Sequence, residues 1–189
     1  MKASGAHLCD VENSTLVVID IQTRLGKSMP SKVLTRVVEN TVFLLKSAEL
    51  MGVPVIASEQ YPKGLGEYVS EVNENLPATT QHIQKTCFSC CGSDEFMEIL
   101  EKSGRKQVIL TGMEAHVCVL QTAIELQEHG YEVFTVGDAI CSRRLDNYQN
   151  ALERLEYLGV NQTNTESVVF EWLRDAKNEY FKEIAAWLQ

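Results

Sequence analysis

The segment "VILTGMEAHVCVLQTAIELQEHGYEVFTVGDA", residues Val108 to Ala139, carries the clearest signal of the fold. It opens with an apolar run typical of a buried strand, passes through a short turn, continues with apolar residues at helical spacing, and closes with a second apolar run. Strand, helix and strand in this order favour a parallel βαβ unit. Cys118 stands where the turn becomes the helix, just past the end of the first strand.

The same alternation extends over the rest of the chain. Ser31 and Ser93 are expected to cap helices, and Gly52 and Gly104 to end them. The pattern predicts an α/β fold in one domain, residues 1–189: three α/β/α layers around a doubly wound, six-stranded, mostly parallel sheet. The expected strands are 14–20, 53–59, 80–86, 106–112, 131–139 and 160–165, and the expected helices are 31–52, 93–104, 116–130, 145–159, 166–173 and 176–188.

Composition excludes several classes of partner. The net charge is −9 with no basic cluster, which argues against binding to nucleic acid or to anionic membranes. No run approaches the roughly 20 apolar residues of a membrane span. The first residues lack the apolar centre of a secretion signal, and six cysteines without such a signal favour free thiols in a reducing compartment. We expect a cytoplasmic protein, with an organelle matrix such as the mitochondrial one left open.

Three chemically active side chains follow expected strands, at the edge where such sheets bind ligands. Asp20 follows the first strand, Lys85 the third, and Cys118 the fourth. Each has a plain alternative: a carboxylate that caps a turn, a solvated charge, and a small buried hydrophobe. The position of Cys118 near the first turn of a helix favours an anion there, so we expect a lowered thiol pKa.

Together these residues predict nucleophilic catalysis on a carbonyl compound. Asp20 would take the thiol proton, Lys85 would stabilise the thiolate, and Cys118 would attack the carbonyl carbon. Backbone N–H groups of the turn would bind the oxyanion, and water would cleave the resulting thioester. Possible substrate contacts are Gln22, Tyr61, Phe88 and His116, for which loop or core packing is the alternative. His116 is two residues before Cys118. If both residues are helical, their side chains point in different directions, so we do not expect His116 to be the base.

The segments "LVVIDIQ" with Asp20, "KTCFSC" with Lys85 and "GMEAHVCV" with Cys118 follow one another in this order. In these features the chain resembles the isochorismatase-like cysteine hydrolases, a superfamily that includes nicotinamidases and N-carbamoylsarcosine amidase. The resemblance implies a catalytic triad of Asp20, Lys85 and Cys118. It also implies a non-proline cis peptide between Met113 and Glu114, an oxyanion hole formed by the backbone N–H groups of Glu114 and Cys118, and a homo-oligomer.

Two departures from the family pattern narrow this interpretation. The segment "SEQYPKGLG" lacks the aspartate and histidines that hold the metal of nicotinamidases, so no metal or cofactor is expected. Cys118 argues against a true isochorismatase, whose vinyl-ether hydrolysis needs no thiol. The chain is most similar to the short, metal-free isochorismatase-domain subgroup. Cys87, Cys90 and Cys91 lack a second ligand pair, which disfavours zinc and leaves a redox thiol open.

The expected function is hydrolysis of a small amide or related carbonyl compound, acting on a non-peptide C–N bond, with a small molecule as partner. A non-catalytic oligomeric scaffold with a vestigial triad is one alternative. An RNA-processing nuclease is another, disfavoured by the acidic charge.

Overall fold

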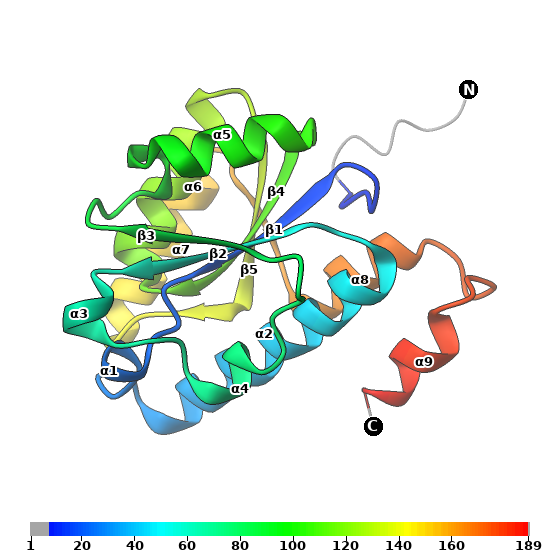
Figure 1. Ribbon diagram of the computed structural model, residues 1–189, viewed down its shortest axis with the longest axis horizontal. Helices are drawn as coiled ribbons and strands as arrows, with labels where there is room; N and C mark the ends of the chain where they lie inside the picture. Colours follow the sequence, from blue (N-terminus) through cyan, green and yellow to red (C-terminus); the bar gives the residue numbers. More distant parts are fainter. Residues whose placement is uncertain (1–7, 189) are drawn as a thin grey trace.

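The computed structural model describes residues 8–188; residues 1–7, where part of the expectation about a secretion signal falls, and residue 189 lie outside the described part. Six strands form one sheet in the order β3-β2-β1-β4-β5-β6 (Figure 1). All pairings between these strands are parallel, so the sheet is parallel throughout rather than mostly. The strands are β1 (Ser14–Ile19), β2 (Val55–Gln60), β3 (Gln81–Lys85), β4 (Gln107–Met113), β5 (Glu132–Cys141) and β6 (Asn161–Thr163).

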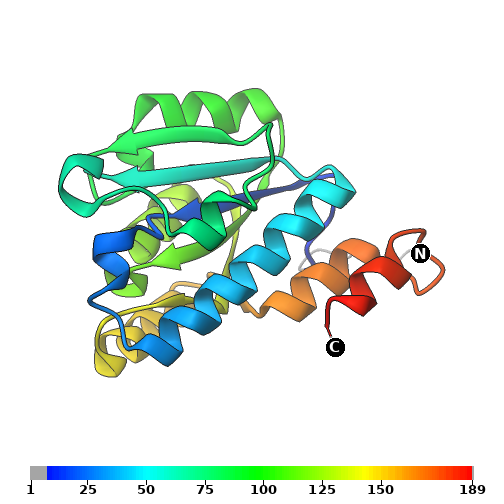
Figure 2. The same ribbon diagram turned by 60° about the horizontal axis from the view of Figure 1, so that its bottom comes forward.

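Helices cover both faces of this sheet and give the expected three layers (Figures 1 and 2). One face carries α2 (Ser31–Met51) and α8 (Thr165–Leu173), with α9 (Phe181–Ala186) beside them. The other face carries α5 (Asp94–Ser103), α6 (Leu120–Glu128) and α7 (Leu145–Tyr157). Short helical turns complete the chain: α1 (Thr23–Gly26), α3 (Pro62–Leu65), α4 (Ser70–Asn73), η1 (Cys90–Gly92) and η2 (Ala115–Val119).

The central strand β1 contributes to a separate apolar core on each face of the sheet. Leu16 and Val18 pack into the core under α2 and α8. Val17 and Ile19 pack into the core under α5 and α6. Burial on both faces explains why this strand is a continuous apolar run instead of an alternating one. Within residues 8–188, no helix has the length and apolar character needed to span a membrane.

Local signals fix most element boundaries, with two differences. Ser93 caps α5 by accepting a hydrogen bond from the Phe96 N–H, as expected, but Ser31 is the first residue of α2 and its side chain makes no capping bond. The helix expected over 176–188 is confined to Phe181–Ala186. Asp175 and Asn178 accept hydrogen bonds from nearby backbone N–H groups, which holds the preceding segment in turns instead of a helix.

Candidate active site

The candidate site lies at the carboxyl ends of β1 and β4, where the strand order reverses. From β1 the chain proceeds outward to β2 and β3, then returns to place β4 on the opposite side of β1. Such a reversal opens a crevice beyond the strand ends. The two strands approach closely because Gly112 has a φ of +112° and no side chain; a Cβ there would lie 1.9 Å from the carbonyl oxygen of Ile19.

Asp20 directly follows β1 and is fully buried. Its φ of 51° is left-handed, a conformation that aspartate tolerates better than most residues. The carboxylate accepts hydrogen bonds from Lys85 Nζ at 2.7 Å on Oδ2 and from Ser58 Oγ at 2.8 Å on Oδ1. Burial raises the pKa of Asp20; the Lys85 ammonium, the Ser58 hydroxyl and the nearby Cys118 thiol oppose the rise because they stabilise the ionised form.

Lys85 is the last residue of β3, two strands away from β1, and its side chain reaches across β2 to Asp20. Nζ also donates to Gln60 Oε1 at 2.8 Å and to the Phe88 carbonyl at 3.1 Å. Burial lowers the pKa of Lys85, but electrostatic attraction to Asp20, Cys90 and Cys118 outweighs this effect. The pKa of Lys85 therefore lies above its ordinary value. Lys85 is therefore an ammonium, although only 4 % of the residue is exposed.

Cys118 lies in the π-helical turn η2, between β4 and α6, and is 5 % exposed. Burial and the neighbouring Asp20 carboxylate raise the pKa of its thiol to about 12, with Lys85 acting in the opposite direction. The expected lowering of this pKa is therefore wrong, because desolvation and the aspartate outweigh both the ammonium and the helix start. The resting sulfur is therefore a thiol that lies close to the Asp20 carboxylate.

The turn before Cys118 is held by an ion pair. The peptide bond between Met113 and Glu114 is cis, at the position that the family resemblance implied. The Glu114 side chain is buried and binds Arg143 in a bidentate manner, with Nη2 at 2.5 Å and Nε at 3.1 Å from Oε1. The Arg143 backbone N–H donates to Oε2 at 2.9 Å. These bonds tie the turn after β4 to the segment after β5.

Two of the four possible substrate contacts have other tasks. The buried Gln22 side chain donates to the carbonyls of Gln60 and Gly66 and accepts from the Gln60 N–H, so its polar atoms bind backbone groups, as loop packing requires. The two ring nitrogens of His116 contact Ser142 Oγ at 2.9 Å and Asn147 Nδ2 at 3.2 Å, so its polar atoms are engaged away from Cys118.

The other two lie at the surface beside the triad. Tyr61 is 55 % exposed and Phe88 54 % exposed. Tyr61 and Lys85 belong to the wall of a hollow of about 310 Å³, which neither Asp20 nor Cys118 lines. The hollow is lined by Tyr61, Pro62, Lys63, Gln84, Lys85 and Thr86.

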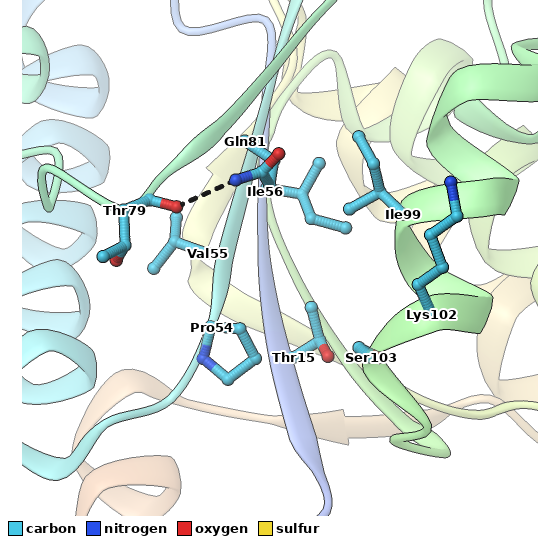
Figure 3. Close-up of a pocket in the computed structure, with 9 residues that line it drawn as sticks. All are labelled: Thr15, Pro54, Val55, Ile56, Thr79, Gln81, Ile99, Lys102 and Ser103. Atoms are coloured by element: carbon cyan, nitrogen blue, oxygen red, sulfur yellow. Dashed lines mark hydrogen bonds between the residues drawn. The ribbon is translucent and has the colours of Figure 1, made fainter.

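A second hollow of about 320 Å³ lies at the opposite end of the sheet, where the strands begin (Figure 3). It is formed by the beginnings of β1, β2 and β3 and the end of α5, and no carboxylate, histidine or cysteine lines it. The Thr15 hydroxyl in its wall has no hydrogen-bond partner among the described residues and is sealed from solvent. The reactive groups thus gather at the other end of the sheet.

The remaining cysteines are free thiols. Within residues 8–188, no group of three or more His, Cys, Asp and Glu side chains is placed to hold a metal ion. Sequence reasoning missed Ser58 and Gln60, which contact Asp20 and Lys85. Their signal is present in the sequence: they are polar residues at alternate positions near the carboxyl end of a strand that begins with apolar residues.

Comparison with known proteins places the chain in a family. Residues 14–167 match the family model for the isochorismatase domain. The fold, the match and the relatives show that the chain belongs to the isochorismatase-like hydrolase family, whose members are generally hydrolases. The chain is 35 % identical over 179 residues to "Isochorismatase family protein 1B" of Dictyostelium discoideum, covering 92 % of this chain and 84 % of that protein.

Solved structures share the fold. The structure of the MAR1 ribonuclease from Caenorhabditis elegans has a TM-score of 0.90 at 33 % identity, covering 96 % of this chain and 92 % of that one. The YcaC gene product of Escherichia coli, described as an octameric hydrolase of unknown specificity, has a TM-score of 0.86 at 22 % identity, covering 100 % of this chain and 89 % of that one. At that identity the second likeness concerns the fold alone.

Proposed function

We propose that this chain is a cysteine hydrolase that cleaves a small amide or related carbonyl compound through a thioester on Cys118. The observation that carries the proposal is the buried ion pair of Asp20 and Lys85, 2.7 Å apart, with the Cys118 thiol near enough for the Asp20 charge to raise its pKa. A buried acid, a fixed positive charge and a thiol in one crevice are the groups that covalent carbonyl chemistry requires.

The raised thiol pKa determines the order of proton movements. Since a thiol with a pKa of about 12 is protonated at neutral pH, Asp20 takes the proton while Sγ bonds to the carbonyl carbon. The carbonyl oxygen becomes an oxyanion, for which the backbone N–H groups of Glu114 and Cys118 are the proposed donors. As the intermediate collapses, the C–N bond breaks and the proton on Asp20 passes to the leaving amine.

The second half of the reaction reuses the same groups. Asp20, ionised again, accepts a proton from water while the water oxygen attacks the thioester carbon. The C–S bond breaks, the acid product leaves, and the proton on Asp20 returns to the sulfur. Lys85 keeps its proton throughout and stabilises negative charge, first on Asp20 and then on the departing sulfur. The hollow of about 310 Å³ beside Lys85 offers room for a small molecule.

A panel of small amides tests this proposal, using wild type, Cys118→Ala and Cys91→Ala. Cys91 is a matched control because it is a free, half-buried thiol on the neighbouring loop whose pKa burial also raises to about 12. We expect hydrolysis by wild type and Cys91→Ala only. Acid-quenched wild type should carry the acyl group on the peptide that contains Cys118, as measured by mass spectrometry. Undiminished hydrolysis by Cys118→Ala would refute the thioester route.

RNA cleavage is the second candidate, favoured by the structural likeness to a protein named as a ribonuclease. The net charge of −9 weighs against it. Cleavage of a labelled RNA that disappears in Cys118→Ala would support this candidate. Cleavage that persists in Cys118→Ala would assign the activity to a contaminant or to a different site.

We also propose that the chain forms a homo-oligomer. Large apolar side chains are exposed on α7 and just beyond α7 and α9, and these are candidates for burial between copies. They include Leu145, Tyr157, Leu158 and Trp187. Light scattering coupled to size-exclusion chromatography should give a multiple of the chain mass. A monomer mass at micromolar concentration would refute this assignment.

A further inference from the structure

Strand β2 separates Asp20 from Lys85, because it lies between β1 and β3 in the sheet. Alternate residues of a strand face the same side, so Ile56, Ser58 and Gln60 point to one face. Ile56 packs into the core that also contains Cys118. Ser58 and Gln60 continue that row toward the carboxyl end of β2, where the triad lies. Both are buried, which is unusual for polar side chains without a task.

Each of these two side chains binds one charged member of the triad. Ser58 Oγ donates to Asp20 Oδ1 at 2.8 Å, while Oδ2 of the same carboxylate accepts from Lys85. With a donor on each oxygen, the plane of the carboxylate is fixed. Gln60 Oε1 accepts from Lys85 Nζ at 2.8 Å.

Gln60 is itself held at both ends. Its Nε2 donates to the Thr86 carbonyl at 2.8 Å, and its backbone N–H donates to Gln22 Oε1 at 2.9 Å. The amide oxygen offered to Lys85 therefore has a fixed place. It is also neutral, so it holds the ammonium without competing with Asp20 as a counter-charge.

We propose that Ser58 and Gln60 are positioning residues of the hydrolase: Ser58 orients the Asp20 carboxylate toward the Cys118 thiol, and Gln60 fixes the Lys85 ammonium beside it. This inference rests on the proposed function, and its tests need no substrate.

The first test is an NMR titration of protein with ¹³C-labelled aspartate carboxyl groups, in which the Asp20 signal is assigned by its loss in Asp20→Asn. Ser58→Ala should raise the pKa of Asp20 by about one unit, because one hydrogen bond to the ionised form is lost. Ser58→Thr, which keeps the hydroxyl, should restore the wild-type value. Ser47→Ala is the matched control, since the buried Ser47 hydroxyl on α2 has no partner among the described residues.

The second test is the rate at which iodoacetamide alkylates Cys118 at pH 8, followed by peptide mass spectrometry. Gln60→Met should slow this rate several-fold, because an ammonium that is no longer held in place stabilises the thiolate less. Gln107→Met is the matched control. Gln107 is also a buried glutamine whose side chain binds backbone groups, but it starts β4 at the opposite end of the sheet. Its substitution should leave the rate unchanged.

If Ser58 and Gln60 had a purely structural role, Ser58→Ala and Gln60→Met would lower the melting temperature, as we expect for Gln107→Met. Such a role would leave the Asp20 titration and the alkylation rate at their wild-type values, and that result would overturn the inference. If Ser58→Ala does not fold, Gln60→Met carries the test through its own readout. Shifted readouts in a protein that forms no thioester would refute the proposed function alone.

Discussion

At the scale of single residues, Asp20 acts on Cys118 in two opposing ways. Its negative charge is the second cause, after burial, of the raised thiol pKa, yet the same carboxylate is the proposed base that removes the proton. A substitution that removes the charge should therefore separate thiol reactivity from turnover. Asp20→Asn is suited to this test because asparagine keeps the side-chain size and tolerates the left-handed backbone.

We predict that Asp20→Asn increases the rate of Cys118 alkylation by iodoacetamide at pH 8 by about tenfold or more, since the thiolate fraction rises tenfold for each unit by which the pKa falls toward pH 8. Amide hydrolysis should fall by about two orders of magnitude or more, because general base catalysis is lost. The two rates are measured on the same preparation. A parallel fall of both rates would contradict the assigned electrostatics.

The sequence indicated which residues to expect in the site, but not the protonation of the thiol. Strand ends and motif order indicated Asp20, Lys85 and Cys118, because these features are local. The thiol pKa depends on burial and on the distance to Asp20, which are properties of the folded chain. The hydrogen bonds of Gln22 were not predictable for the same reason: its partners, Gln60 and Gly66, are brought to it only by folding.

At the scale of elements, the contact between β1 and β4 depends on Gly112. We predict that Gly112→Ala lowers the free energy of unfolding by about 3 kcal/mol or more, or prevents folding, because its Cβ would overlap the Ile19 carbonyl at 1.9 Å. Gly104→Ala is the control: φ is +68° there, but no atom lies within 4 Å of the added Cβ. It should cost only the conformational strain, about 1–2 kcal/mol. Equal losses by urea unfolding would show that the strand contact tolerates a side chain.

The ion pair that joins the turn after β4 to the segment after β5 gives a pH-dependent prediction. Burial raises the pKa of Glu114, but the hydrogen bonds and charge of Arg143 outweigh it and hold that pKa below its ordinary value. A carboxyl group with a depressed folded-state pKa stabilises the fold above its unfolded pKa and loses this contribution as the pH falls through the folded value.

We therefore predict that Arg143→Ala costs about 1 kcal/mol at pH 7, a modest figure because half of the arginine side chain is exposed to solvent. The difference from wild type should shrink as the pH falls below the ordinary glutamate range. Urea unfolding at several pH values measures it. Arg144→Ala is the control, because Arg144 follows Arg143 in the chain and its guanidinium forms no ion pair among the described residues. A difference that grew toward low pH would contradict the direction of the Glu114 shift.

Element types were predictable because their signals are periodic and their ends are marked. Gly52 and Gly104 end α2 and α5 in left-handed conformations, as their positions indicated. The continuous apolar runs correctly predicted strands buried on both faces. The π-helical turn at Cys118 was not visible, since an extra residue per turn leaves no mark in the apolar pattern. Side-chain bonds from Asp175 and Asn178 likewise overrode the helical spacing before α9.

At the scale of the whole molecule, a buried ion pair lies at the carboxyl end of the sheet, sealed from water, where charges are costly. Asp20 and Lys85 are 2.7 Å apart, and both side chains have 0 % exposure. Removing one partner of such a pair leaves an uncompensated buried charge, whereas removing both removes the desolvation cost as well. We therefore expect the pair to serve the proposed chemistry more than stability, and a double-mutant cycle distinguishes the two roles.

We predict that Lys85→Met alone lowers the free energy of unfolding at pH 7 by about 3–5 kcal/mol, because the Asp20 carboxylate loses its cation. The double variant Asp20→Asn with Lys85→Met should recover most of that loss or exceed wild type by about 1–4 kcal/mol. It should show no hydrolysis. Urea unfolding of wild type, both single variants and the double variant gives the coupling energy. If the losses of the two single variants simply add in the double variant, Asp20 and Lys85 stabilise the fold independently. That result would contradict an energetic coupling between the two side chains.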